Sequence, residues 1–215
     1  MNTQHGHFGI IPDGGRRWAR REGKSLMEAY STSVPRILEL ATMAYHCGFN
    51  EVSVYCLSLS NLERPQAEVE AVFDTFRGCL HLVEDFIGGN TFKNVRVVGE
   101  IDRLPKDLQE RMSALKRDTI GPVLNLLVAY DSWAELRRAQ QRAVGAPVEL
   151  QHFDVKTPLQ VIFRTAEGTL LSGFLPFQSQ YAHLIVSDRL FNDLSIEDMR
   201  RALEASDHLD HWFGR

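Results

Sequence analysis

Cysteine is scarce in this chain, with three residues among 215. An odd number argues against a disulfide framework, and no two of them have the C-x-x-C spacing that is typical of zinc sites and thiol redox motifs. We therefore expect Cys47, Cys56 and Cys79 to be reduced, structural thiols, as in proteins of a reducing compartment such as the cytoplasm.

Long apolar runs and surplus positive charge are missing as well. No run is long enough to span a bilayer, and residues 1–7 lack the apolar core of a secretory signal peptide. Because 24 Lys and Arg stand against 28 Asp and Glu, the net charge is −4, and the basic footprint of a nucleic-acid-binding protein is absent. We expect a cytoplasmic protein with no transmembrane segment and no nucleic-acid partner. With no repeats and no linker, the sequence predicts one domain over residues 1–215.

What the chain does have is an alternation of short apolar runs with helical patterns. The runs are mostly continuous, which is typical of strands buried on both faces of a parallel sheet; they cover residues 8–11, 52–57, 95–98, 123–129, 161–163 and 184–186. Helical spacing of apolar residues predicts helices over 35–47, 66–87, 104–117 and 133–144, with a loop over 145–157. The predicted fold class is α/β, an open and mostly parallel sheet flanked by helices.

Two segments near expected helix starts have the form of a capping box. In this motif a Ser and an acidic residue three positions later each bind the other's backbone N–H. The segments are Ser132-x-x-Glu135 and Ser195-x-x-Asp198. His208 and His211 follow the last expected helix, and we interpret them as part of a solvated tail rather than a metal site.

The most informative segment follows the first apolar run, where Asp13 precedes Gly14, Gly15, Arg16 and Arg17. Glycines let backbone N–H groups approach an anion closely, and a helix N-terminus adds favourable partial charge. The arginines add forked donors for the same anion, and a strand-end carboxylate can hold a divalent metal against it. The pattern alone leaves a plain strand–turn–helix junction open, because it is neither G-x-G-x-x-G nor a Walker loop.

Three blocks in order resemble the cis-prenyltransferases, the undecaprenyl diphosphate synthase-like enzymes. DGGRRWA at residues 13–19 is similar to the family signature D-G-N-G-R-W-A. YCLSLSNLERP at 55–65 is similar to Y-x-x-S-x-E-N-W-x-R-P. FRTAEGTLLSGFLPFQSQYA at 163–182 is similar to I-R-T-G-G-E-x-R-x-S-x-F-L-x-W-Q-x-x-Y-A-E. Together the blocks span nearly the whole chain, which makes them far more specific than any one alone.

The resemblance implies a prenyltransferase that joins allylic and homoallylic prenyl diphosphates with Mg²⁺, a homodimer, and six parallel strands. Asp13 matches the aspartate that holds magnesium, and Ser58 and Asn61 match positions beside the condensing carbon, where a proton leaves. With Arg64 of the second block, these are the expected catalytic residues. The expected diphosphate contacts are Gly14, Gly15, Arg16 and Arg17 for the allylic substrate, and Arg164, Thr165 and Ser172 for the second diphosphate.

The apolar stripe of residues 66–87 is interpreted first as core or dimer packing. The resemblance adds that this helix walls a tunnel for the prenyl tail. Phe73, Phe76 and Phe86 are bulky enough to shorten that tunnel, which favours short products.

The chain departs from the family pattern in each of the three blocks, and four departures bear on the substrate sites. Leu26 and Leu170 stand where chain-elongating members have diphosphate-binding arginines, Tyr30 stands at a histidine position, and His183 at a magnesium-holding glutamate. We count Tyr30 and His183 among the substrate-binding residues, and the imidazole of His183 is open to metal or to phosphate. Two missing arginines remove charge-assisted hydrogen bonds worth about 1.5–3 kcal/mol each, which argues against ordinary elongation on isopentenyl diphosphate.

A PDGxRRW loop without the downstream arginine is similar to the lavandulyl-type branch, whose members join two allylic units head-to-middle. The sequence therefore predicts an enzyme that condenses dimethylallyl or geranyl diphosphate into a branched C10 or C15 prenyl diphosphate and releases diphosphate. A short-chain head-to-tail enzyme and a prenyl diphosphate cyclase stay open. A silent partner subunit is disfavoured because Asp13, Arg16, Arg17 and Arg164 are retained.

Overall fold

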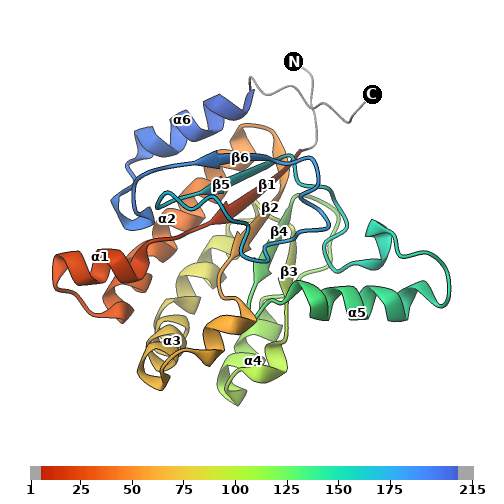
Figure 1. The fold of residues 1–215 in the computed structure, drawn as a ribbon, viewed down its shortest axis with the longest axis horizontal. Helices are drawn as coiled ribbons and strands as arrows, with labels where there is room; N and C mark the ends of the chain where they lie inside the picture. Colours follow the sequence, from red (N-terminus) through yellow and green to blue (C-terminus); the bar gives the residue numbers. More distant parts are fainter. Residues whose placement is uncertain (1–5, 208–215) are drawn as a thin grey trace.

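The computed structural model describes residues 6–207, so His208 and His211 lie outside the described range. Six strands form one sheet in which every neighbouring pair is parallel (Figure 1). Their order across the sheet is β3-β4-β2-β1-β5-β6. They are β1 (Gly6–Ile11), β2 (Phe49–Tyr55), β3 (Asn94–Val98), β4 (Val123–Leu127), β5 (Val161–Arg164) and β6 (His183–Val186). The predicted α/β class with six parallel strands is confirmed.

Helices connect the strands and cover both faces of the sheet. They are α1 (Gly15–Glu22), α2 (Leu26–His46), α3 (Gln66–Gly88), α4 (Lys106–Ala114), α5 (Ser132–Ala143) and α6 (Ile196–Asp207). Short 3₁₀ turns occur at η1 (Leu59–Glu63), η2 (Ile101–Arg103), η3 (Leu150–His152) and η4 (Phe191–Asp193). No helix within residues 6–207 is long and apolar enough to cross a membrane.

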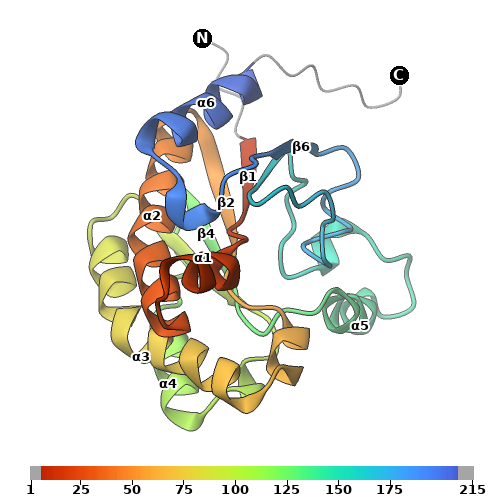
Figure 2. The same cartoon turned by 60° about the vertical axis from the view of Figure 1, so that its left-hand side comes forward.

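The two faces of the sheet are covered unequally. Figure 2 shows α2, α3, α4 and α6 on one side of the strands, with α5 and the long connections around it on the other. The larger apolar core lies under the four helices, and a smaller cluster around Tyr130 and Phe174 lies on the α5 face. Because both faces are covered, the strands appear in the sequence as continuous apolar runs.

α2 begins nine residues earlier than the expected start at residue 35. Ser25 and Glu28 form a capping box, in which Ser25 Oγ accepts from Glu28 N–H (3.1 Å) and Glu28 Oε2 accepts from Ser25 N–H (2.8 Å). Pro35 therefore lies inside the helix, where it removes one backbone hydrogen bond but does not end the helix. This extra length brings the first turns of α2 to the end of the sheet where β1 finishes.

The two predicted capping boxes have different outcomes. Ser195 and Asp198 form theirs, with both reciprocal bonds present. The one at Ser132 is wrong, because Asp131 caps α5 instead by accepting from Ala134 N–H (2.8 Å). Glu135 is fully buried, and it accepts from the Tyr130 hydroxyl (2.6 Å) and from two backbone N–H groups of the following loop. Its carboxylate thus fastens that loop to the α5 face.

A buried polar row crosses the α5 face of the sheet. His7 Nε2 lies 2.7 Å from Ser53 Oγ, and His7 Nδ1 lies 2.9 Å from the Thr157 carbonyl oxygen. Asn125 donates to both Ser53 (2.9 Å) and Glu51 (2.7 Å). Burial lowers the pKa of His7, so the imidazole is neutral in the folded protein at neutral pH.

Candidate active site

A cavity of about 1050 Å³ opens at the edge of the sheet where β1, β2 and β5 end. The chain leaves β1 toward β2 on one side, while β5 lies on the other side of β1. Ligands of open α/β sheets bind outside the carboxyl ends of the strands at such a switch point. Every expected site residue lines this cavity except Thr165 and His183.

Glycine shapes the turn from β1 into α1. Gly14 has a φ of 104°, and a Cβ there would lie 2.8 Å from the side chain of Leu190. A Cβ on Gly15, the first residue of α1, would lie 3.1 Å from the ring of Tyr30. The turn therefore packs closely on both sides and leaves the N–H groups at the start of α1 at the cavity, an arrangement suited to an anion.

Asp13 is tied to both strands of the switch point. Its Oδ1 accepts from Gly14 N–H (2.6 Å), and its Oδ2 accepts from Arg164 Nη2 (2.9 Å). The Thr165 hydroxyl donates to the Asp13 carbonyl (2.8 Å) and accepts from Asp13 N–H (2.9 Å). The side chain is still 39% exposed, so the carboxylate can be approached from the cavity.

Arg164 ends β5, and its side chain is only 10% exposed. Beside the bond to Asp13, its Nη1 donates to Ser172 Oγ (2.9 Å) and to the Leu170 carbonyl. Its Nε is buried and has no hydrogen-bond partner among the residues that the structure describes. Gly168 lies directly over the guanidinium, because a Cβ at that position would collide with Nε.

The connection that folds over Arg164 is conformationally costly. Ala166, Glu167 and Ser172 all have left-handed φ angles, of 64°, 57° and 51°. Non-glycine residues rarely adopt this region, and such strain is concentrated at functional sites. The cost supports a role for this connection in holding the guanidinium.

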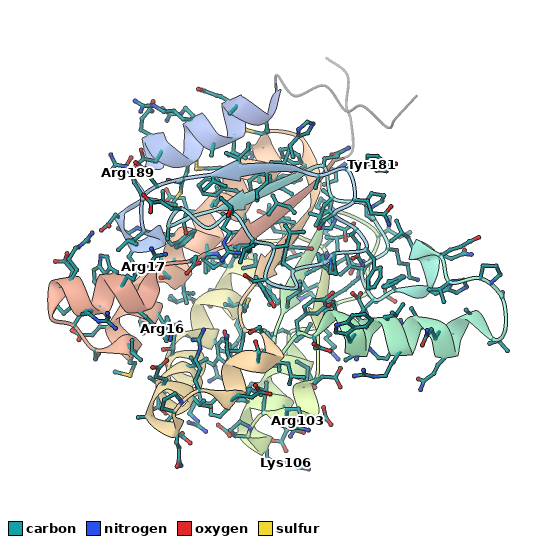
Figure 3. All side chains as sticks on the ribbon, viewed as in Figure 1. Arg16, Arg17, Arg103, Lys106, Tyr181 and Arg189 are labelled. Carbon is teal, nitrogen blue, oxygen red and sulfur yellow. The ribbon has the colours of Figure 1, made fainter. Side chains whose placement is uncertain are left out.

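The two arginines of α1 have different partners. Figure 3 shows Arg16 and Arg17 at the end of α1 nearest the sheet. Arg17 Nη2 donates to the Ala166 carbonyl (2.9 Å), which links α1 to the connection after β5. Arg16 Nη1 lies 3.4 Å from Glu68 Oε2 on α3, and 54% of the Arg16 side chain is exposed. Arg16 therefore retains most of its freedom to bind an anion in the cavity.

Ser58 and Asn61 meet at the turn after β2. Ser58 Oγ accepts from Asn61 N–H (3.2 Å) and lies 3.0 Å from Ser60 Oγ. Ser58 is thus the cap of η1 as well as a residue of the cavity wall, and Arg64 follows at the end of the same turn. The capping bond fixes these side chains beside the cavity without using the Ser58 proton.

Burial sets the protonation of the phenol and thiol groups on the wall. It raises the pKa of Tyr30, and it raises the pKa values of Tyr55 and Cys56 to about 12. All three groups therefore stay neutral at neutral pH. The Tyr55 hydroxyl donates to the Ser172 carbonyl (3.1 Å), which braces the acceptor side of the cavity against β2.

The deeper wall is apolar and lies between α2 and α3. It includes Val34, Ile37, Leu38, Val72, Phe76, Leu80, Val83, Met112, Leu126 and Val128. From position 72 to position 83 it follows α3 for roughly 16 Å, at 1.5 Å per residue. Of the three phenylalanines expected to shorten the tunnel, Phe76 alone lines it. Phe73 lies in the core, and Phe86 packs on Phe92 with ring centroids 5.8 Å apart.

The structure places Thr165 and His183 outside the wall for different reasons. Thr165 lies behind Asp13 and fixes its backbone, so its contribution is indirect. His183 pairs with Val161 at the amino end of β5, whereas Arg164 pairs with Val186 at the carboxyl end. Within one chain His183 therefore lies away from the cavity wall, and its expected contact with the diphosphates or their metal stays a prediction.

Three charged wall residues were missed by the sequence motifs: Arg20, Lys24 and Glu68. Arg20 follows Arg16 by four residues, and this helical spacing places both on one face of α1. Glu68 stands in the first turn of α3, between apolar residues that were interpreted as a packing stripe. The four-residue spacing from Arg16 could have identified Arg20 as a residue of the cavity wall. No pattern in the sequence could have identified Glu68.

The residues present suit Mg²⁺ rather than a metal that needs a full protein cage. Within residues 6–207 there is no group of three or more His, Cys, Asp or Glu side chains placed to hold a metal. Asp13 supplies one accessible carboxylate beside two sets of anion-binding groups. Mg²⁺ usually takes one or two carboxylates and completes its shell with water and substrate phosphates.

Comparison with known proteins gives consistent matches. The family model described as "Putative undecaprenyl diphosphate synthase" matches residues 11–214. An isoprenyl transferase of Campylobacter jejuni is 26% identical, over 97% of this chain and 98% of that protein. An isoprenyl transferase of Aquifex pyrophilus is 28% identical, over 97% and 95%.

Solved structures with the same fold include two enzymes of known name. Lavandulyl diphosphate synthase from Lavandula x intermedia, in complex with dimethylallyl diphosphate, has a TM-score of 0.85 at 22% identity. A probable undecaprenyl diphosphate synthase from Campylobacter jejuni has a TM-score of 0.79 at 21% identity. Both likenesses cover 100% of each chain.

Proposed function

The chain belongs to the cis-prenyltransferase family and is a prenyltransferase, and on this basis we propose that it joins two short allylic prenyl diphosphates head-to-middle. The proposed substrates are dimethylallyl diphosphate and, as a longer partner, geranyl diphosphate. The product is a branched C10 or C15 prenyl diphosphate, and diphosphate is released. Mg²⁺ is the proposed cofactor.

One observation carries this proposal: two anion-binding segments face the same cavity from opposite sides of Asp13. The donor segment is the turn from Gly14 to Arg17, and the acceptor segment runs from Arg164 to Ser172. The donor segment presents two guanidinium groups and the acceptor segment presents one, and both adjoin an apolar wall suited to a prenyl tail. A reaction between two prenyl diphosphates requires this arrangement, because two anions and two tails must be held with their reacting carbons in contact.

The residues supply binding, orientation and charge stabilisation. In the reaction the C–O bond of the donor breaks, its diphosphate leaves, the acceptor double bond attacks the donor carbon, and the acceptor loses a proton. Bound at Asp13, magnesium would stabilise the departing diphosphate. Arg16, Arg17 and the N–H groups of α1 bind the same anion, while Ser58 and Asn61 lie on the wall beside the place where the proton leaves.

An allylic acceptor is favoured by the weakened acceptor segment. Leu170 directs a 71% exposed apolar side chain to the surface, so Arg164 is the guanidinium that remains from the two expected there. The fold likeness to a lavandulyl diphosphate synthase that binds dimethylallyl diphosphate supports the same direction. Ordinary head-to-tail elongation on isopentenyl diphosphate is the second candidate. It is favoured by the undecaprenyl diphosphate synthase description of the matching family model and by the cavity's extension beyond Phe76 to Val83.

We also propose a homodimer through the β6 edge of the sheet. His183, Leu184 and Ile185 are only half-buried and Val186 is 38% exposed, whereas all of β1 is buried. A partly exposed apolar strand at the edge of a sheet favours association with another chain. Light scattering coupled to size-exclusion chromatography should give twice the chain mass, and Val186→Lys should shift it toward the monomer. An unchanged monomer mass for the wild type would contradict the dimer.

Product analysis tests the head-to-middle reaction. Purified protein with Mg²⁺ receives dimethylallyl diphosphate alone, then with geranyl diphosphate, then with isopentenyl diphosphate. The dephosphorylated products are identified by mass spectrometry and NMR. Branched alcohols from allylic substrates alone are expected. Linear products that require isopentenyl diphosphate would instead establish head-to-tail elongation.

A further inference from the structure

Arg164 is a charged residue that bonds to both halves of the cavity. It binds Asp13 on the metal side and Ser172 on the acceptor side, and it comes from β5 while Asp13 follows β1. Since its side chain is 10% exposed, it cannot exchange these contacts for water freely. Any ligand that takes an N–H donor of Arg164 must therefore weaken the hydrogen bond and the charge stabilisation that Arg164 gives to Asp13.

At the switch point each of these charges neutralises the other. Each Asp13 oxygen accepts one hydrogen bond, from Gly14 N–H and from Arg164. Both terminal nitrogens of the Arg164 guanidinium are bonded, and within residues 6–207 its buried Nε has no partner. An anion that approaches the acceptor segment thus meets a cation whose charge is already compensated.

A dication at Asp13 changes this balance. Bound at Asp13, Mg²⁺ would repel the guanidinium on the same carboxylate and would weaken the bond between Arg164 and Asp13. Arg164 cannot retreat, because Gly168 closes over its Nε and Leu170 and Ser172 hold its Nη1. The freed Nη2 then offers its N–H donors to an oxyanion as charge-assisted hydrogen bonds, while Nε stays buried under Gly168.

We propose that Arg164 is a positioning residue. Its bond to Asp13 keeps it from binding the acceptor diphosphate until a metal replaces Arg164 at the Asp13 carboxylate. This inference rests on the proposed function, and it deepens that function by assigning an order of binding. Metal at Asp13 and diphosphate at Arg164 bind cooperatively, and by linkage each raises the affinity for the other by the same factor. The acceptor segment therefore becomes able to bind its diphosphate once the metal that serves the donor is bound at Asp13.

The inference makes a prediction that opposes the usual effect of mutating a metal ligand. In EDTA, Asp13→Asn should bind dimethylallyl diphosphate more tightly than the wild type, by roughly tenfold, because a neutral amide no longer competes for Arg164. Adding Mg²⁺ should tighten binding by the wild type and leave Asp13→Asn unchanged. Isothermal titration calorimetry measures the metal-free affinities without turnover, and in the arm with Mg²⁺ inorganic diphosphate replaces dimethylallyl diphosphate so that no condensation takes place.

Two further variants separate this exchange from a simple change of charge. Glu68→Gln removes a negative charge from the same cavity but from a carboxylate paired with Arg16, so metal-free affinity should change by less than about threefold. In an Arg164→Gln background, Asp13→Asn should give no gain, since the cation that it would release is absent. Circular dichroism melts confirm that the four variants remain folded.

The outcomes distinguish this inference from the proposed function. No gain for Asp13→Asn in EDTA, or a gain that persists undiminished with Arg164→Gln, overturns the exchange and leaves the prenyl diphosphate reaction standing. If the wild type binds no dimethylallyl diphosphate with or without Mg²⁺, both proposals are overturned. A gain for Asp13→Asn that depends on Arg164 and is not reproduced by Glu68→Gln supports the exchange.

Discussion

The two arginine–carboxylate pairs of the cavity differ in how firmly they are held. Arg164 lies 2.9 Å from Asp13 and its side chain is 10% exposed, whereas Arg16 lies 3.4 Å from Glu68 and is 54% exposed. Arg164 is covered by Gly168 and bonded to Ser172, and Arg16 has solvent on one side. The acceptor side is therefore pre-organised and the donor side is adjustable, so equal changes on the two sides should have unequal effects.

Asp13→Ala should produce the largest effect, because it removes the metal-binding carboxylate of the turn. We expect kcat/KM to fall by roughly 10²–10³, the range seen when one group that stabilises transition-state charge is lost. The melting temperature should change little, since Asp13 lies in a turn and is 39% exposed. Steady-state kinetics with Mg²⁺ and thermal melts measure the two quantities. Turnover at the wild-type rate would show that the metal assignment is wrong.

Gly168→Ala should come next, because its methyl group would displace the Arg164 guanidinium. A displacement of about 1 Å can cost roughly 100-fold in rate, and we expect that loss in kcat/KM for the acceptor. Gly78→Ala is the matched control, since a Cβ at position 78 meets nothing within 4 Å. A Gly168→Ala enzyme with normal acceptor kinetics would mean that the cover over Arg164 is not needed.

Glu68→Gln should have a smaller effect, because it breaks the exposed pair. We expect kcat/KM to change by about two- to fivefold, as for other surface ion pairs. The change should fall in donor KM rather than in acceptor KM, and initial rates at varied concentrations of each substrate resolve the two. An effect as large as that of Gly168→Ala would mean that the donor side is held as firmly as the acceptor side.

A pH test on His7, which lies outside the cavity wall, checks that the contrast between the two arginine–carboxylate pairs is confined to the cavity and is not a property of the whole sheet. Burial lowers the His7 pKa in the folded state, so the unfolded chain binds more protons below its ordinary value of 6.5. Stability should therefore be retained above that pH and fall as the pH drops toward the lower folded pKa. Urea unfolding at pH 7.5 and 5.5 should show a smaller loss for His7→Gln than for the wild type. Equal losses would assign the acid sensitivity to other groups.

The sheet and the phosphate turn could be predicted because they depend on short-range patterns. Continuous apolar runs reported strands buried on both faces, and DGGRRWA joined a strand end, flexible backbone and cations within seven residues. The start of α2 was missed because Pro35 suggests a boundary, whereas the capping box at Ser25 and Glu28 sets it.

The remaining differences concern which way a side chain points. Glu135 matched a capping pattern by spacing, yet it turns inward to bind Tyr130 and the loop beyond α5. Phe73 and Phe76 lie three residues apart on one apolar stripe, but only Phe76 reaches the cavity. His183 occupies the expected place in the alignment of motifs but lies at the amino end of β6. Such outcomes depend on the register of strands and the rotation of helices, which local sequence does not determine.

The pairing of β1 with β5 has a consequence for how the protein is made. Asp13 and Arg164 are separated by 151 positions, and β1, β2, β3 and β4 are all synthesised before β5. Since folding during synthesis proceeds from the N-terminus, a nascent chain displays the turn and its arginines before their counterpart leaves the ribosome. The carboxylate of Asp13 first gains its guanidinium partner when β5 docks beside β1, so catalytic competence is among the last properties that the newly made chain acquires.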